Sequence, residues 1–417
     1  MSFRRPRFPG ERALVTGISI DATGSGMYVP FTLVFFLHVT GLPLGVIGVV
    51  LTVTGLAAIA TVPLAGTAVD RFGAKRVQLF LYVLRAVSFA LFPLADQLPT
   101  FAALALLTAI GTRAFPAVLQ ARIAELVGEG DRDRMQALQR SLGNAGLGAG
   151  TLLASLLIAV GGDAGYVIAA LANAGSFLLA ALLALRTPAS PVAAAHGRAE
   201  RPGSYRLVAR DRPFLALILA NVLVALGYTS LTVLLPVYSD WLELPEGLTG
   251  VAFVVNTALC ATLGVPVGAL IRHRFTTRSR AAAAGAGLFV LSFLGMTAIG
   301  VVRPHHVSVL LGCLLAAVIV MTMGELVHSP AAAALTQAVA PAELRGRYMA
   351  AFQLSWSLAY ALTPALFTLL LSVDGRLPWL VVTVTSLLGG ALLLRVERSL
   401  APEAVRFPPR TASALPT

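Results

Sequence analysis

The sequence predicts an all-α membrane protein whose twelve transmembrane helices form two six-helix bundles, and three observations support this fold class. First, hydrophobic residues make up 57% of the chain and charged residues only 12%, whereas a soluble domain typically carries about 25% charged residues. Second, apolar runs of roughly 20 residues, the length that crosses a bilayer, recur about twelve times. Third, basic residues gather in alternate loops between these runs.

The predicted spans follow one another with short loops. We expect them near residues 13–37, 45–69, 77–95, 100–122, 138–160, 165–186, 213–238, 248–271, 281–302, 307–333, 348–372 and 378–395. The longest polar stretch, 187–212, separates six spans from six and is expected to be a cytoplasmic linker. Residues 1–186 and 213–395 would then form the two bundles. The Pro-rich polar tail, 396–417, is expected to be cytoplasmic and disordered.

The distribution of basic residues predicts the orientation in the membrane. One set of loops holds almost all of the arginines, and the opposite loops hold only Arg303 and Arg376 beside several Asp and Glu residues. Because basic loops stay in the cytoplasm, and because an even number of spans puts both ends on one side, both termini are expected to be cytoplasmic. The net charge of +12 does not indicate nucleic-acid binding, since these cations lie in short turns and form no continuous patch.

A charged turn between the second and third spans carries the most specific motif of the chain, made of Gly66, Asp70, Arg71, Gly73, Lys75 and Arg76. It resembles the signature loop of the major facilitator superfamily, G-x-x-x-D-R-x-G-R-[RK]-[RK], and departs from it at Ala74, where that family usually has a basic residue. The resemblance implies two pseudo-symmetric bundles, with this loop forming part of a cytoplasmic gate. It also implies that Glu125, at the cytoplasmic end of the fourth span, pairs with the loop.

Three charged residues inside the predicted spans are candidate site residues. Asp21, Arg113 and Glu325 lie roughly 12 to 15 Å from the cytoplasmic ends of spans 1, 4 and 10, at ~1.5 Å per residue. An ionisable side chain this deep costs roughly 2.5–3.5 kcal/mol, so each is expected to have a function or a partner. In the superfamily that the chain resembles, these spans line the central cavity.

Two interpretations of these charges remain open. In the functional one, Asp21 carries the coupling proton beside the positive charge of Arg113, and Glu325 is a second titratable group or binds a cationic substrate. In the structural one, Asp21 and Arg113 neutralise each other and hold spans 1 and 4 together. Arg85 lies on a span that is peripheral in this family, and it is expected to have a structural or snorkelling role.

Further resemblance concerns the drug:proton antiporters of the superfamily, which often carry an arginine at the position of Arg113. The fifth span is similar to their glycine-rich motif and contains Asn144, Gly146, Gly148 and Gly150. It departs at Thr151, where a Gly-Pro pair is usual, and close helix packing alone would also explain the glycines. Candidate cavity-lining residues, each of which could equally serve packing, are Tyr28, Asn221, Tyr228, Asn256, Gln353, Trp356 and Tyr360.

The remaining residues predict neither catalysis nor a cofactor. Lys75, the only lysine, follows Ala74, so the chain has no Walker A phosphate loop. Cys260 and Cys313 lie in apolar spans and form no disulfide framework or metal-binding pattern. Hydrolase motifs are missing as well. We therefore expect a protein that is not an enzyme, holds no metal or cofactor, and acts as a monomer.

These patterns predict a secondary transporter of the bacterial cytoplasmic membrane. We expect proton-coupled export of a small amphipathic or cationic compound by alternating access, so that the partners are the substrate, protons and the lipid bilayer. An uptake symporter for a small nutrient or metabolite is the alternative, with the same fold and the opposite coupling. A non-transporting sensor or scaffold is disfavoured, because it has no need for charges near the bilayer centre.

Overall fold

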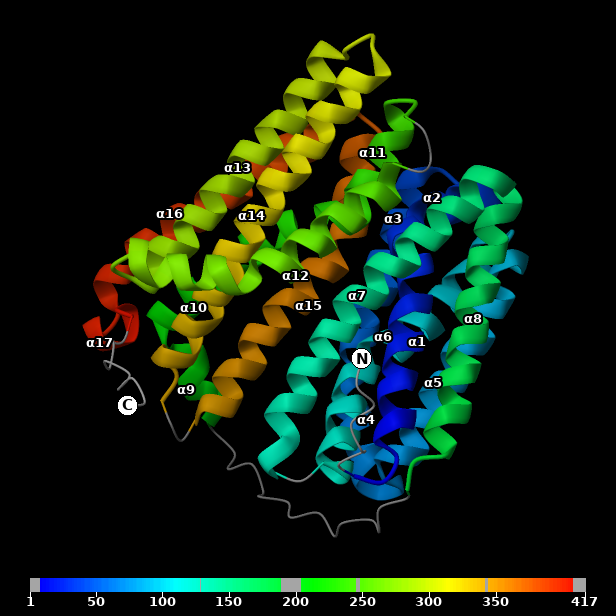
Figure 1. Ribbon diagram of the computed structural model, residues 1–417, viewed down its shortest axis with the longest axis horizontal. Helices are drawn as coiled ribbons and strands as arrows, with labels where there is room; N and C mark the ends of the chain where they lie inside the picture. Colours follow the sequence, from blue (N-terminus) through cyan, green and yellow to red (C-terminus); the bar gives the residue numbers. More distant parts are fainter. Residues whose placement is uncertain (1–7, 128, 189–203, 245–247, 342–343, 408–417) are drawn as a thin grey trace, which may run out of the picture. The chain divides into compact units, whose positions relative to one another are not determined.

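The computed structural model describes residues 8–127, 129–188, 204–244, 248–341 and 344–407. It consists almost wholly of helices, as Figure 1 shows. Within the described residues, ten helical segments are long and apolar enough to cross a membrane, and a bent pair makes an eleventh. The remaining expected span is α12, Leu248–Arg274, in which the apolar helical part Thr249–Gly264 is shorter. The predicted all-helical membrane fold is confirmed, while most of the predicted linker, 189–203, lies outside the described residues.

The first six predicted spans correspond to helices α1 to α8. Their bounds are α1 Glu11–Tyr28, η1 Val29–Phe31, α2 Thr32–Thr40, α3 Leu44–Ile59, α4 Val62–Phe72, α5 Ala74–Leu91, η2 Phe92–Leu94, α6 Leu98–Leu126, α7 Glu129–Gly161 and α8 Asp163–Leu185. The second span is bent, since α3 and α4 meet at 43°. Pro63 lies in the first turn of α4, where the missing amide hydrogen of proline ends the hydrogen bonding of α3.

The last six predicted spans correspond to helices α10 to α16. The bounds in this part are α9 Ser204–Arg210, α10 Arg212–Tyr228, the π-helical turn η3 Ser230–Leu234, α11 Leu235–Trp241, α12 Leu248–Arg274, α13 Arg278–Val302, α14 Val307–Val339, α15 Arg345–Leu371, α16 Leu377–Val396, η5 Glu397–Ser399 and α17 Pro402–Val405. The π turn interrupts the seventh span, and Pro236 follows it in the first turn of α11.

Contacts between residues divide the chain into two compact units. Unit 1 comprises Met1–Ala199, Ser230–Thr257 and Ala361–Gly375. Unit 2 comprises Glu200–Thr229, Ala258–Tyr360 and Arg376–Thr417. Unit 1 therefore contains the first six spans together with one end of the seventh, eighth and eleventh spans, so the division follows spatial contact and not only the order of the chain.

Within unit 1, α1 packs against α7 and α8, and α5 packs against α6 and α8 (Figure 1). The end of α15 that belongs to unit 1 is joined to α3, because the amide of Ala365 donates a hydrogen bond of 2.9 Å to Thr52 Oγ1. Gly48 allows this approach, since a Cβ atom there would collide with the side chain of Thr368. The hydroxyl of Thr52 thus binds a segment that lies more than three hundred residues further along the chain, and Gly48 leaves room for it.

Within unit 2, α13 packs against α14 and α16, and α10 packs against α16 (Figure 1). The chain beyond α16 differs from the expected disordered tail, because residues 397–407 fold back onto this bundle. Val405 is buried in a core cluster of unit 2, and Leu400 and Phe407 pack against the same cluster. Polar contacts hold the segment too, since Arg278 donates to the carbonyl of Ala404 at 2.6 Å. Residues 408–417 lie outside the described part of the chain.

Candidate functional site

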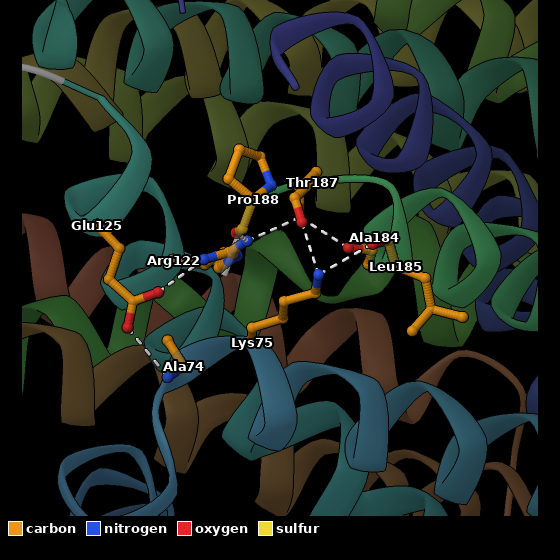
Figure 2. Close-up of polar contacts among 8 residues, drawn as sticks. All are labelled: Ala74, Lys75, Arg122, Glu125, Ala184, Leu185, Thr187 and Pro188. Atoms are coloured by element: carbon orange, nitrogen blue, oxygen red, sulfur yellow. Dashed lines mark hydrogen bonds and ion pairs between the residues drawn. The ribbon is translucent and has the colours of Figure 1, made fainter. Parts of the chain in front are cut away.

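The signature loop reverses the chain between α4 and α5 within unit 1. Gly73 makes this reversal with a φ of 82°, a backbone conformation that side chains disfavour. The amide of Ala74 then donates to Glu125 Oε1 at 3.1 Å (Figure 2). A carboxylate is favourable here because the first turn of a helix presents unpaired amides and a partial positive charge. Glu125 therefore contacts the loop through the start of α5.

Lys75 follows in the first turn of α5 and binds the end of α8. Its Nζ donates to the carbonyl of Leu185 at 2.9 Å and to the carbonyl of Thr187 at 2.6 Å (Figure 2). The last carbonyls of a helix have no partner within the helix, and a lysine near them is favourable for this reason. The single lysine of the chain thus ties the signature loop to the segment that leaves the sixth span.

Arg122, which the sequence did not single out, completes this cluster. Its guanidinium is fully buried and binds Glu125 Oε2 at 2.8 Å, Thr187 Oγ1 at 2.7 Å and the carbonyl of Pro188 (Figure 2). The sequence signal for the pair was the spacing of three residues between Arg122 and Glu125, which places both on one face of α6. We call Lys75, Arg122, Glu125 and Thr187 the loop clamp.

The other predicted loop residues lie on the surface of unit 1. Gly66, Asp70, Arg71 and Arg76 are exposed, and the guanidinium of Arg71 lies 5.3 Å from the ring centre of Phe72. Ala74 is fully buried, so at the position where the family usually has a cation this chain has a small apolar side chain. The cations that bind the end of α8 come from Lys75 and Arg122 instead.

The buried charge of the first span is paired within unit 1. Arg85 Nη1 binds Asp21 Oδ1 at 3.0 Å, and Nη2 donates to Ser25 Oγ at 3.2 Å. Arg85 is 5% exposed, and its guanidinium lies 3.8 Å from the ring centre of Phe177 and 4.9 Å from that of Phe115. The guanidinium is therefore held by one carboxylate, one hydroxyl and two aromatic faces.

This pair corrects one expectation from the sequence and narrows another. Asp21 binds Arg85 instead of the predicted Arg113, and of the two roles expected for Arg85, structural or snorkelling, its burial fits the structural one. Gly111 is one reason, because a Cβ atom there would come within 2.6 Å of the Arg85 side chain. Arg113 lies two residues further along α6, roughly 200° around the helix from Gly111, so its similar depth does not give it the same neighbours.

The glycine-rich motif of the fifth span serves close packing in unit 1. A Cβ on Gly146 or Gly150 would collide with the backbone of α1, and a Cβ on Gly148 would collide with Thr257. Thr151, the departure from the family pattern, donates to the carbonyl of Gly26 on α1 at 3.0 Å. The threonine thus adds a hydrogen bond between the two helices, while Asn144 is exposed.

The predicted residue of the tenth span lies in unit 2 beside aromatic side chains. The hydroxyl of Tyr228 donates to the main-chain carbonyl of Glu325 at 3.3 Å. The Tyr228 ring makes an edge contact with Trp356, with ring centres 4.9 Å apart. Three predicted residues, Tyr228, Glu325 and Trp356, are therefore neighbours in this unit.

The other candidate lining residues have different surroundings. Tyr28 is 4% exposed and packs among Phe35, Phe36, Phe89 and Phe92, which supports the packing interpretation for it. Asn221 is buried and bonds Ser355 in unit 2. Asn256 is half-buried and Gln353 is exposed. The described residues contain no group of three or more His, Cys, Asp or Glu side chains arranged to hold a metal ion.

The many apolar spans define a multi-pass membrane protein. The chain belongs to the Major Facilitator Superfamily, whose family model matches residues 14–324. It is a transporter and not an enzyme.

Two relatives share a name. The multidrug resistance protein MdtH of Edwardsiella ictaluri is 28% identical over 308 residues, which cover 71% of this chain and 70% of that protein. The MdtH protein of Proteus mirabilis is 26% identical over 289 residues, with 68% and 67% covered.

Solved structures show the same fold at low identity. A bacterial homologue of the iron transporter ferroportin in its inward-facing state matches with a TM-score of 0.75 at 16% identity, over 94% of this chain and 99% of that one. A D-xylose–proton symporter matches with a TM-score of 0.69 at 16% identity, over 94% and 98%.

Proposed function

We propose that this transporter exports small amphipathic or cationic compounds in exchange for protons, by alternating access in the bacterial cytoplasmic membrane. The observation that carries the proposal is the ion pair between Asp21 and Arg85, a carboxylate and a guanidinium inside the spanning part of unit 1. The names of the relatives, multidrug resistance proteins, support export of such compounds. Both termini are proposed to be cytoplasmic, as the positive-inside rule indicates, and the protein is proposed to act as a monomer.

The pair offers a way to couple a proton to the conformation. An arginine guanidinium does not give up its proton in proteins, so Asp21 is the member of the pair that can bind and release a proton. Protonation of Asp21 would remove the ionic part of its bond to Arg85 and leave the guanidinium to Ser25 and the two phenylalanine faces. The contact of α1 with α5 would then weaken. A proton shifts the equilibrium between conformations only if its affinity differs between them, and a pair that is made in one state and loosened in another provides that difference.

The aromatic group in unit 2 is the proposed contact for the substrate. Tyr228 and Trp356 form an aromatic pair, and Tyr228 bonds the main chain of the acidic residue Glu325. Aromatic faces with one acidic side chain attract organic cations through the ring quadrupole and the charge together. Glu325 is therefore proposed to bind the cationic part of the compound. Arg113 is proposed to line the cavity. The loop clamp is proposed to form part of the cytoplasmic gate.

The test is a proton-flux measurement in everted membrane vesicles that contain the full-length protein. An inward-acidic gradient is imposed, and tetraphenylphosphonium or ethidium is added. Wild type is expected to dissipate the gradient on addition of the compound, and Asp21→Asn is expected not to. Asp163→Asn is the matched control, because the Asp163 side chain is 85% exposed at the start of α8.

Two outcomes would overturn the proposal. If Asp21→Asn dissipates the gradient like wild type, Asp21 does not carry the coupling proton. If no compound dissipates the gradient, while right-side-out vesicles accumulate a nutrient when the outside is acidified, the protein is the alternative uptake symporter.

A further inference from the structure

A small cavity lies inside unit 2, among α10, α14, α15 and α16. Each of its lining residues is at most 9% exposed. Its polar lining residues are Asn221, His328 and Thr336, and the others are apolar. The volume that the centre of a water molecule can occupy in this cavity is about 10 Å³, which is close to the minimum needed to hold one water molecule.

His328 presents a hydrogen-bond acceptor to this cavity. Its Nδ1 lies 2.9 Å from the carbonyl oxygen of Ala282 on α13. Because a carbonyl only accepts, Nδ1 must carry the proton, and in the neutral ring Nε2 is then an acceptor. Nε2 is buried and has no hydrogen-bond partner among the described residues. Gly285 makes this geometry possible, since a Cβ atom there would collide with the backbone of α14 at His328.

Asn221 presents a second acceptor. Its Nδ2 donates to Ser355 Oγ at 2.6 Å, and the single hydroxyl proton of Ser355 is donated to the carbonyl of Phe352 at 2.6 Å. Ser355 can therefore only accept from Asn221, which fixes the amide with Oδ1 as the other terminal atom. Oδ1 is buried, and no described residue donates to it. The hydroxyl of Thr336 does not serve either acceptor, because it donates to Ala332 in its own helix.

Two buried acceptors that line one cavity call for a ligand with two donors. We infer that the cavity binds one water molecule, which donates one hydrogen bond to His328 Nε2 and the other to Asn221 Oδ1. An ammonium or hydronium ion could also donate twice, but the lining residues include no carboxylate to balance a buried charge. The bound species is therefore neutral water.

The water completes a hydrogen-bonded chain through four helices of unit 2. The chain runs from Ala282 on α13 to His328 on α14, through the water to Asn221 on α10, and through Ser355 to Phe352 on α15. His328 lies three residues after Glu325, on the same side of α14. The water thus fixes α14 against α10 one turn from the carboxylate that is proposed to bind substrate, and the inference itself does not depend on that proposal.

Nuclear magnetic resonance of the full-length protein in nanodiscs, labelled with ¹⁵N at the histidine rings, tests the site directly. The His328 signal is identified as the one of the six histidine signals that is lost in His328→Phe. We expect the neutral tautomer with the proton on Nδ1, together with a cross-peak between a long-lived water and the ring protons. A proton on Nε2 would mean that the ring offers no acceptor there, and a ring without a water cross-peak would mean that the cavity is dry; either result would overturn the inference.

Thermal unfolding of variants gives an independent test. Asn221→Leu removes the bond to Ser355 and one bond of the water. His328→Phe removes the bond to Ala282 and the other bond of the water. Each variant is therefore expected to lower the Tm. The double variant also loses the direct bonds to Ser355 and Ala282, but the shared water can be lost only once, so its loss is expected to be smaller than the sum of the two single losses. The control pairs Asn221→Leu with Thr383→Val on α16, whose hydroxyl bonds within its own helix, and these losses should add. Additive losses for Asn221 and His328 would contradict the inference, and if a variant does not fold, the resonance measurement on the wild type decides.

Discussion

Removal of Arg85 should be the most damaging single change among the buried charges. Arg85→Gln would leave the Asp21 carboxylate without its cation in the interior of unit 1. Breaking a buried ion pair by removing one partner costs about 3–5 kcal/mol. The lost contact with the Phe177 and Phe115 rings adds roughly 0.5–2 kcal/mol, because that guanidinium is desolvated. The sum is a large part of the stability of a typical domain, so a marked fall in Tm is expected.

The pairing itself is tested by a second substitution. Asp21→Asn removes the uncompensated charge, so the double variant Asp21→Asn/Arg85→Gln should be more stable than Arg85→Gln alone. The measurement is thermal unfolding of purified protein in detergent, followed by intrinsic fluorescence. Arg113→Gln is the matched control and should not be rescued by Asp21→Asn. If Asp21→Asn rescues Arg113→Gln and fails to rescue Arg85→Gln, the assignment of the partner is wrong.

Three further changes test the packing around the site. Arg122→Gln leaves Glu125 without its buried cation and should lower the free energy of unfolding by about 3–5 kcal/mol, measured as a fall in Tm, while Arg71→Gln at the exposed loop should leave the Tm unchanged. Deletion of residues 400–417 removes the contacts of Val405 with the core of unit 2 and should lower the Tm, whereas deletion of 408–417 should not; equal Tm values for the two deletions would refute the docked tail. Gly150→Val should abolish the monodisperse peak in size-exclusion chromatography because its side chain would collide with α1, and Gly143→Val, which meets nothing within 4 Å, should keep it.

The parts that were predictable from the sequence depend on one-dimensional patterns. Apolar run length placed most spans within a few residues, because crossing a bilayer needs a similar apolar length in every helix, although α7 begins at Glu129 instead of near 138. The signature loop was recognisable because its residues are contiguous, and Glu125 lies where the resemblance put it.

The parts that were missed depend on rotation about helix axes and on contacts between distant segments. Depth alone could not choose between Arg85 and Arg113, since the choice depends on the space that Gly111 leaves on one side of α6. The burial of Arg122 depends on Thr187 and Pro188, which follow it by more than sixty residues. Composition indicated disorder for the tail because its few apolar residues are spread out, yet Leu400, Val405 and Phe407 all reach one cluster.

In both units a cation at the start of the third span binds the segment that follows the sixth span, but the cation is a different residue in each unit. In unit 1, Lys75 at the start of α5 donates to the carbonyls of Leu185 and Thr187, which follow the sixth span. In unit 2, Arg278 at the start of α13 donates to the carbonyl of Ala404, which follows the last span. A cation in the first turn of one helix thus ties down the segment that leaves another, in each unit separately. Because lysine and arginine both donate to carbonyls, this shared role needs no shared motif.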